Sequence, residues 1–181
     1  MVYILLAEGF EEVEAITPGD LLRRVDIDVK TVSITNDLYV KGGHDITVRA
    51  DITLEQIDFD ALEMLVLPGG LGGVNTIKES PAAMELILKV WKADRKLAAI
   101  CAAPTLLAKL GIIKGLSVVC HPSVGNEIMD AGGRLLHNRQ VVCDGNLITG
   151  KAAGTSTEFA LELIAVMRDS ETSEQIRKAI T

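Results

Sequence analysis

Short apolar runs alternate with stretches of helical pattern along this chain, and that alternation restricts the fold more than any other feature. The runs at 2–7, 64–67 and 97–100 contain no charged residue. Runs of this kind are typical of strands buried on both faces of a sheet. Strands that alternate with helices predict an α/β fold, with a doubly wound, mostly parallel sheet and helices on both faces.

The length of 181 residues suits one domain, 1–181, and no repeat or linker divides it. Ser80-Pro81 predicts a helix start, because serine caps a helix and proline is tolerated at its first position. Asp144-Gly145 predicts a hairpin turn. The other expected elements are a helix from 11 to about 25, strands at 27–34, 46–50 and 116–120, a turn at 41–44, a glycine-rich loop after 68–70, and helices from 104, at 154–167 and at 171–180.

Charge and hydropathy exclude several classes of partner. A net charge of -7 argues against nucleic acid and against anionic membranes, since both need a basic face. No apolar run approaches the roughly 18 residues of a membrane span, and the run before Glu8 is also too short for a signal peptide. The three cysteines lack paired spacing, which predicts no disulfide framework and a cytoplasmic location.

Several chemically active residues follow the predicted strands. Ligands of doubly wound sheets bind beyond the carboxyl ends of the strands. The segments expected there are 9–14, Gly69-Gly70, Cys101 and His121. The sequence therefore predicts that an acid, a glycine corner, a thiol and an imidazole meet at one edge of the sheet.

Cys101 lies in the stretch Ala98-Ala-Ile-Cys-Ala-Ala-Pro104, where a strand is expected to turn into a helix. Small neighbours permit such a turn, and the N–H groups of the helix start stabilise a thiolate. A helix end contributes about 1 kcal/mol, whereas lowering a thiol pKa by about three units needs roughly 4 kcal/mol. A second group is required, either protonated Glu14 or cationic His121. The alternative is that Cys101 is a small buried hydrophobe.

The neighbouring candidates also have purely structural interpretations. Acidic residues in the first turn of a helix are favoured by the dipole alone, and a histidine before proline is an ordinary loop residue. Gly69-Gly70 either turns the chain or frees an N–H for an oxyanion. We expect Cys120 to lie in the core and Cys143 to be structural. We expect no metal site, because His44 and His137 lack partners at helical or strand spacing.

Two glycine-rich segments approach nucleotide-binding motifs without completing them. Residues 145–152 resemble a P-loop, but Ala152 stands where the motif needs serine or threonine. Residues 68–73 resemble a dinucleotide fingerprint, but Asn75 replaces its third glycine. We therefore expect no nucleotide cofactor.

Together these residues resemble the ThiJ/PfpI superfamily, in the branch of the parkinsonism-associated protein deglycase (DJ-one). The resemblance implies a flavodoxin-like fold, similar to class I glutamine amidotransferases, with no cofactor and commonly a homodimer. The stretches that carry it are Ala7-Glu-Gly-Phe-Glu-Glu-Val-Glu14, Val66-Leu-Pro-Gly-Gly70, Ala98-Ala-Ile-Cys-Ala-Ala-Pro104, His121-Pro122 and Gly154-Thr-Ser-Thr-Glu-Phe-Ala160.

The resemblance also implies roles for individual residues. Cys101 matches the nucleophile, Glu14 its paired acid and His121 the family histidine, while Gly70 and Ala102 supply oxyanion N–H groups. The implied function is a deglycase or glyoxalase acting on methylglyoxal, glyoxal or their protein adducts, with a role in oxidative stress. The alternative is a redox sensor or chaperone that uses oxidation of Cys101, and a cysteine peptidase is the weakest hypothesis.

Two positions depart from the family pattern. Lys151-Ala-Ala-Gly154 stands where many relatives carry Arg-Gly-Pro-Gly, and His44 stands near a position where some carry arginine. Both are expected near the pocket or the dimer edge, so these departures bear on substrate preference.

Overall fold

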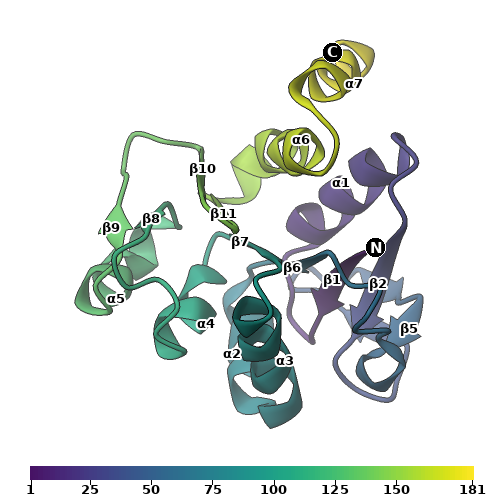
Figure 1. The fold of residues 1–181 in the computed structure, drawn as a ribbon. Coiled ribbons are helices and arrows are strands. Elements are labelled where there is room, and N and C mark those ends of the chain that lie inside the picture. The colour runs from purple at the N-terminus through teal and green to yellow at the C-terminus, as the bar shows by residue number, and fades with distance from the viewer.

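A computed structural model describes all residues 1–181, and its centre is one sheet of seven strands (Figure 1). The strand order is β10-β11-β7-β6-β1-β2-β5, and every neighbouring pair is parallel except β10 with β11. This confirms the predicted doubly wound fold. The strands are β1 (Val2–Leu6), β2 (Val29–Ser33), β5 (Ile52–Thr53), β6 (Met64–Leu67), β7 (Lys96–Ile100), β10 (Val141–Asp144) and β11 (Leu147–Gly150).

Helices cover both faces of the sheet, because each buried strand presents apolar side chains to both sides. In β1, Tyr3 and Leu5 face one core, and Val2, Ile4 and Leu6 face the other. In Figure 1, α1, α6 and α7 lie on one side and α2 to α5 on the other. The helices are α1 (Glu12–Arg23), α2 (Leu71–Glu79), α3 (Pro81–Lys92), α4 (Pro104–Lys109), α5 (Gly125–Asp130), α6 (Ser156–Met167) and α7 (Ser170–Ile180).

Two small sheets lie outside the main one. The predicted turn at 41–44 joins β3 (Tyr39–Lys41) to β4 (Thr47–Arg49) in an antiparallel pair. The other small sheet pairs β8 (Ser117–Val118) with β9 (Arg134–Leu135) in parallel. The expectation that 116–120 is a strand of the main sheet was therefore wrong. The place beside β7 is taken by β11, with Leu147 opposite Leu97.

The segment after Gly70 also differs from the prediction, because the expected loop is helix α2. Glycine disfavours helices, yet two glycines lie in the first turn of α2. Their lack of side chains permits close packing, since a Cβ on Gly73 would lie 2.8 Å from Phe10 Cα. No helix of the structure is long and apolar enough to cross a bilayer.

Candidate active site

Cys101 forms the turn between strand β7 and helix α4. Its φ of 64° lies in the left-handed region, which is rare for residues other than glycine and is strained. Two hydrogen bonds hold the turn: the Cys101 N–H donates to Gly150 O at 3.0 Å, and the His121 N–H donates to Cys101 O at 2.8 Å. A strained conformation fixed from both sides presents the thiol at a defined position.

Glu14 reaches this turn from the first turn of α1 and is completely buried. Its Oε2 accepts a hydrogen bond of 2.7 Å from the Gly69 N–H, while Oε1 has no hydrogen-bond partner. Gly69 lies against both the acid and the cysteine. A Cβ there would lie 2.6 Å from Glu14 Oε2 and 2.7 Å from Cys101 Cβ. Only glycine fits beside both side chains.

The Glu14 carboxyl holds its proton more tightly than an ordinary glutamate does. Burial raises its pKa to about 7, against the lowering effect of the Gly69 N–H and of the Cys101 thiol. The negative charge of Glu11 acts in the same direction as burial. A carboxyl with this pKa can both give and take a proton near neutral pH.

The Cys101 thiol is affected in the direction opposite to the sequence prediction. Burial and the neighbouring Glu14 carboxylate raise its pKa to about 12, although the N–H groups of Gly70 and Ala102 lower it. The expected N–H groups are thus present at the sulfur, but burial and the Glu14 carboxylate outweigh them. Because the two groups interact, they titrate as a pair. Between pH values of about 7 and about 12 the pair keeps one proton, and a thiolate forms when Glu14 holds it.

His121 reaches the site through its backbone. It precedes the 3₁₀ turn Pro122–Val124, and its N–H bonds to the carbonyl of Cys101. Its ring Nδ1 lies 2.8 Å from Ser123 Oγ and accepts a 3.2 Å hydrogen bond from the Ser123 N–H. The ring makes no hydrogen bond to Cys101 or Glu14. The structure therefore brings Glu14, Gly70, Cys101 and Ala102 together and joins His121 to them through its backbone.

A cluster that the sequence did not predict lies at the start of α1. His44 Nδ1 is 2.9 Å from Glu12 Oε2 and 3.6 Å from Glu11 Oε1, so His44 has acidic partners in space although none stands at helical or strand spacing in the sequence. The hydrogen bond to Glu12 raises the pKa of His44. The three groups lie close enough to share an ion. Gly42 is the one residue in the sequence that could have indicated this cluster, because a Cβ there would overlap the Glu12 carboxylate.

The other two cysteines lie away from Cys101. Cys120 is buried as predicted, and burial raises its pKa to about 11. Cys143 is exposed on the edge strand β10, which corrects the expectation of a structural role.

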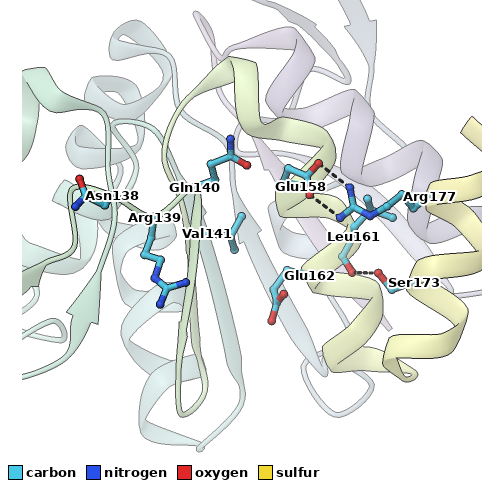
Figure 2. Close-up of a pocket in the computed structure, with 9 residues that line it drawn as sticks. All are labelled: Asn138, Arg139, Gln140, Val141, Glu158, Leu161, Glu162, Ser173 and Arg177. Atoms are coloured by element: carbon cyan, nitrogen blue, oxygen red, sulfur yellow. Dashed lines mark hydrogen bonds and ion pairs between the residues drawn. The ribbon is translucent and has the colours of Figure 1, made fainter. Parts of the chain in front are cut away.

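A cavity of about 450 Å³ lies away from the site, between residues 138–141 and helices α6 and α7 (Figure 2). Two contacts join the helices that form its wall. Arg177 makes paired hydrogen bonds of 2.8 and 2.6 Å to Glu158, and the Ser173 hydroxyl donates to Leu161 O at 2.8 Å (Figure 2). The cavity contains none of the predicted site residues.

Comparisons with known proteins show what this chain is similar to in sequence and fold. A model of the DJ-1/PfpI family matches residues 1–166. Protein dj-1beta of Drosophila melanogaster is 36% identical over 177 residues, which cover 98% of this chain and 94% of that protein. The crystal structure of Drosophila melanogaster DJ-1beta superposes with a TM-score of 0.94 and covers 99% of this chain and 96% of that chain.

Two further relatives have names that state an activity. The glutathione-independent glyoxalase DJR-1.2 of Caenorhabditis elegans is 29% identical over 177 residues, or 98% of this chain and 93% of that protein. A deglycase of Pyrococcus abyssi is 28% identical over 167 residues, or 92% of this chain and 99% of that protein.

Proposed function

Because this chain belongs to the DJ-1/PfpI family, we propose that it is a cysteine-dependent enzyme of the glyoxalase or deglycase type. Its substrates would be α-oxoaldehydes such as methylglyoxal and glyoxal, or their protein adducts. The observation that carries the proposal is the buried Glu14 carboxyl beside the strained Cys101 turn. The activities named for two relatives support the same class of reaction.

In the first step the Cys101 thiolate adds to the aldehyde carbon of methylglyoxal. A carbon–sulfur bond forms, and the π electrons of the carbonyl group become an alkoxide. The N–H groups of Gly70 and Ala102, which face the sulfur, stabilise that negative charge. Protonation of the alkoxide gives a hemithioacetal.

In the second step Glu14 transfers a proton between neighbouring carbons. Its carboxylate removes the proton from the former aldehyde carbon and leaves an enediolate, the anion of the enediol. Glu14 returns that proton to the adjacent carbon, and the hydroxyl proton of the former aldehyde carbon passes to the oxygen of the adjacent carbon. The former aldehyde carbon is thereby oxidised to a thioester and the ketone carbon reduced to an alcohol, so no external oxidant is needed. Water then cleaves the thioester, releases lactate and restores the thiol. A pKa of about 7 suits Glu14 to this work.

The partner we propose is a second copy of this chain. Val13 and Ile16 of α1 are 42% and 44% exposed, and Ile46 beside them is 57% exposed. The N–H of His44, two residues before Ile46, donates to Glu12 Oε1 at 2.7 Å, so the three apolar side chains lie on neighbouring segments. Ile16→Asp would place a charge in this patch. We expect it to convert a dimer to a monomer in sedimentation, and a wild-type monomer would contradict the proposal.

The location we propose is the cytoplasm, because all three cysteines are free thiols. A reducing compartment keeps Cys101 able to react.

The test is lactate formation from methylglyoxal by wild type, Cys101→Ala and Cys143→Ala. Product is measured because exposed thiols and amines also bind methylglyoxal reversibly. We expect Cys101→Ala to lose about a thousandfold or more in kcat/KM, and Cys143→Ala to keep wild-type activity. A wild type that forms no lactate but is oxidised at Cys101 by peroxide would favour the redox sensor.

A further inference from the structure

His121 has one ring nitrogen engaged by a group that can only donate a hydrogen bond. The Ser123 backbone N–H donates to Nδ1 at 3.2 Å. The Ser123 hydroxyl lies 2.8 Å from the same nitrogen. A nitrogen that accepts from a backbone N–H carries a lone pair and no proton, so the neutral ring holds its proton on Nε2.

The turn that makes this contact is fixed at both ends. The Val124 N–H donates to His121 O at 3.1 Å, and the His121 N–H donates to Cys101 O at 2.8 Å. Pro122 occupies the first position of the 3₁₀ turn, where its ring restricts the backbone. The Ser123 N–H therefore points back at the imidazole because of the local fold.

We infer that Ser123 is a positioning residue that keeps neutral His121 protonated at Nε2, so that the ring donates a hydrogen bond to a substrate oxygen and does not act as the base. The inference rests on the proposed function and narrows it. Glu14 alone moves protons, and no proton leaves Nε2 while the alkoxide and the enediol form. The preferred substrates are those that present an oxygen acceptor next to the carbon bound to sulfur, as α-oxoaldehydes do.

The first test reads the tautomer directly by ¹⁵N NMR of the histidine rings, assigned by His44→Gln, His121→Gln and His137→Gln variants. For His121 we expect Nδ1 to give a signal of an unprotonated nitrogen and Nε2 that of a protonated one. The reverse assignment would overturn the inference. We expect Ser123→Ala, which keeps the backbone N–H, to keep the same tautomer and a kcat within about threefold of wild type. We expect Ser123→Pro, which removes that N–H, to populate the other tautomer and to lower kcat by about three- to tenfold with little change in KM. An unchanged tautomer in Ser123→Pro would remove the Ser123 N–H from the argument.

The second test uses amide side chains that imitate one ring nitrogen each. The glutamine amide reaches the place of Nε2, and the asparagine amide reaches that of Nδ1. We expect His121→Gln to keep kcat/KM within about fivefold of wild type, and His121→Asn and His121→Ala to lose about tenfold to a hundredfold. Equal losses in all three variants would mean that the ring acts as a base. His137→Gln is the control, since His137 is exposed.

The two proposals fail in different ways. If the proposed function is wrong, wild type forms no lactate, and the NMR spectrum still reports the tautomer. If only the role of His121 is wrong, wild type is active and Cys101→Ala is not, but the spectrum or the glutamine variant gives the opposite result.

Discussion

Glu14 and His121 reach Cys101 in two different ways. Glu14 comes from a helix packed in the core, has no exposed surface and, like the cysteine, packs against Gly69. His121 comes from a segment outside the main sheet and is partly exposed. The inner half of the site, formed by Glu14, Gly69 and Cys101, is thus enclosed by packing. The outer half, the segment 117–123 that carries His121, is attached to it from outside.

The outer half is joined to the main sheet by the apolar side chains of Val118 and Cys120, which belong to the core, and by a few hydrogen bonds. The Val119 N–H donates to Thr149 Oγ1 at 3.0 Å, and the Ser117 N–H donates to Asp144 Oδ2 at 2.7 Å. The third is the bond from His121 to Cys101. Packing resists any change of volume, whereas single hydrogen bonds contribute about 1 kcal/mol each. We therefore expect substitutions in the inner half to have the larger effects.

The largest effect is expected from Gly69→Ala. The added methyl group would overlap Glu14 Oε2 and Cys101 Cβ, so both groups must move. We expect kcat/KM for methylglyoxal to fall by about a thousandfold and the free energy of unfolding to fall by about 1–3 kcal/mol. Gly19→Ala is the matched control. It is also buried, but its Cβ would meet only Ile4 Cδ1 at 3.6 Å. Near-normal activity in Gly69→Ala would show that the inner half tolerates displacement.

The pH dependence of folding gives the next largest effect. The pKa of Glu14 is about 7 in the folded state and 4.5 without the fold. The folded state binds this proton more tightly than the unfolded chain does. The contribution of Glu14 to the free energy of unfolding is therefore greatest below pH 4.5 and decreases as the pH rises through 7. We expect the wild type to lose about 3 kcal/mol relative to Glu14→Gln over this interval.

Urea unfolding at several pH values measures this difference directly. Glu162→Gln, a carboxyl outside the site, is the control for general charge effects. Parallel stability profiles of wild type and Glu14→Gln would mean that Glu14 titrates normally.

Glu14→Gln also separates the two steps of the coupled titration of Glu14 and Cys101. For wild type we expect the rate of Cys101 alkylation to rise with pH in two steps. The first step has an apparent pKa of about 7, and after a plateau the rate rises again as the pH approaches 12. Glu14→Gln removes the negative charge, so a single step at a pKa below 12 is expected. Activity should fall by about a hundredfold, because the amide transfers no proton. A single step in wild type would contradict the coupling. Peptide mapping distinguishes Cys101 from the other two thiols.

The inner half was more predictable from the sequence than the outer half. The runs at 2–7, 64–67 and 97–100 correspond to β1, β6 and β7. A strand that is apolar on both faces is buried on both faces only at the centre of a sheet. Once these strands are placed, Cys101 and Gly69 follow at their carboxyl ends. The run at 116–120 was misplaced, since its composition is the same in a small sheet as in a large one. The strand that excluded it, β11, lies far along the chain.

The electrostatics of the site could not be predicted from the motif. The helix start at Pro104 is visible in the sequence, and it indicates a lowered thiol pKa. The opposing effects depend on how completely Glu14 and Cys101 are buried. That is a property of long-range packing. His44 illustrates the same limit, because its partners Glu11 and Glu12 are more than thirty residues away.

The smallest effect is expected from Thr149→Val, which tests the outer half alone. The substitution keeps the shape of the buried side chain and removes the acceptor of the Val119 N–H. An unsatisfied buried donor costs about 1–3 kcal/mol, so urea unfolding should show a loss of that size. Activity should fall by only about threefold, because His121 keeps its bond to Cys101 while Glu14 and Gly69 are untouched. Ser173→Ala, which removes a buried hydroxyl far from the site, is the control and should cost stability without activity. If Thr149→Val instead reduced activity as strongly as Gly69→Ala, the outer half would be as tightly constrained as the inner one.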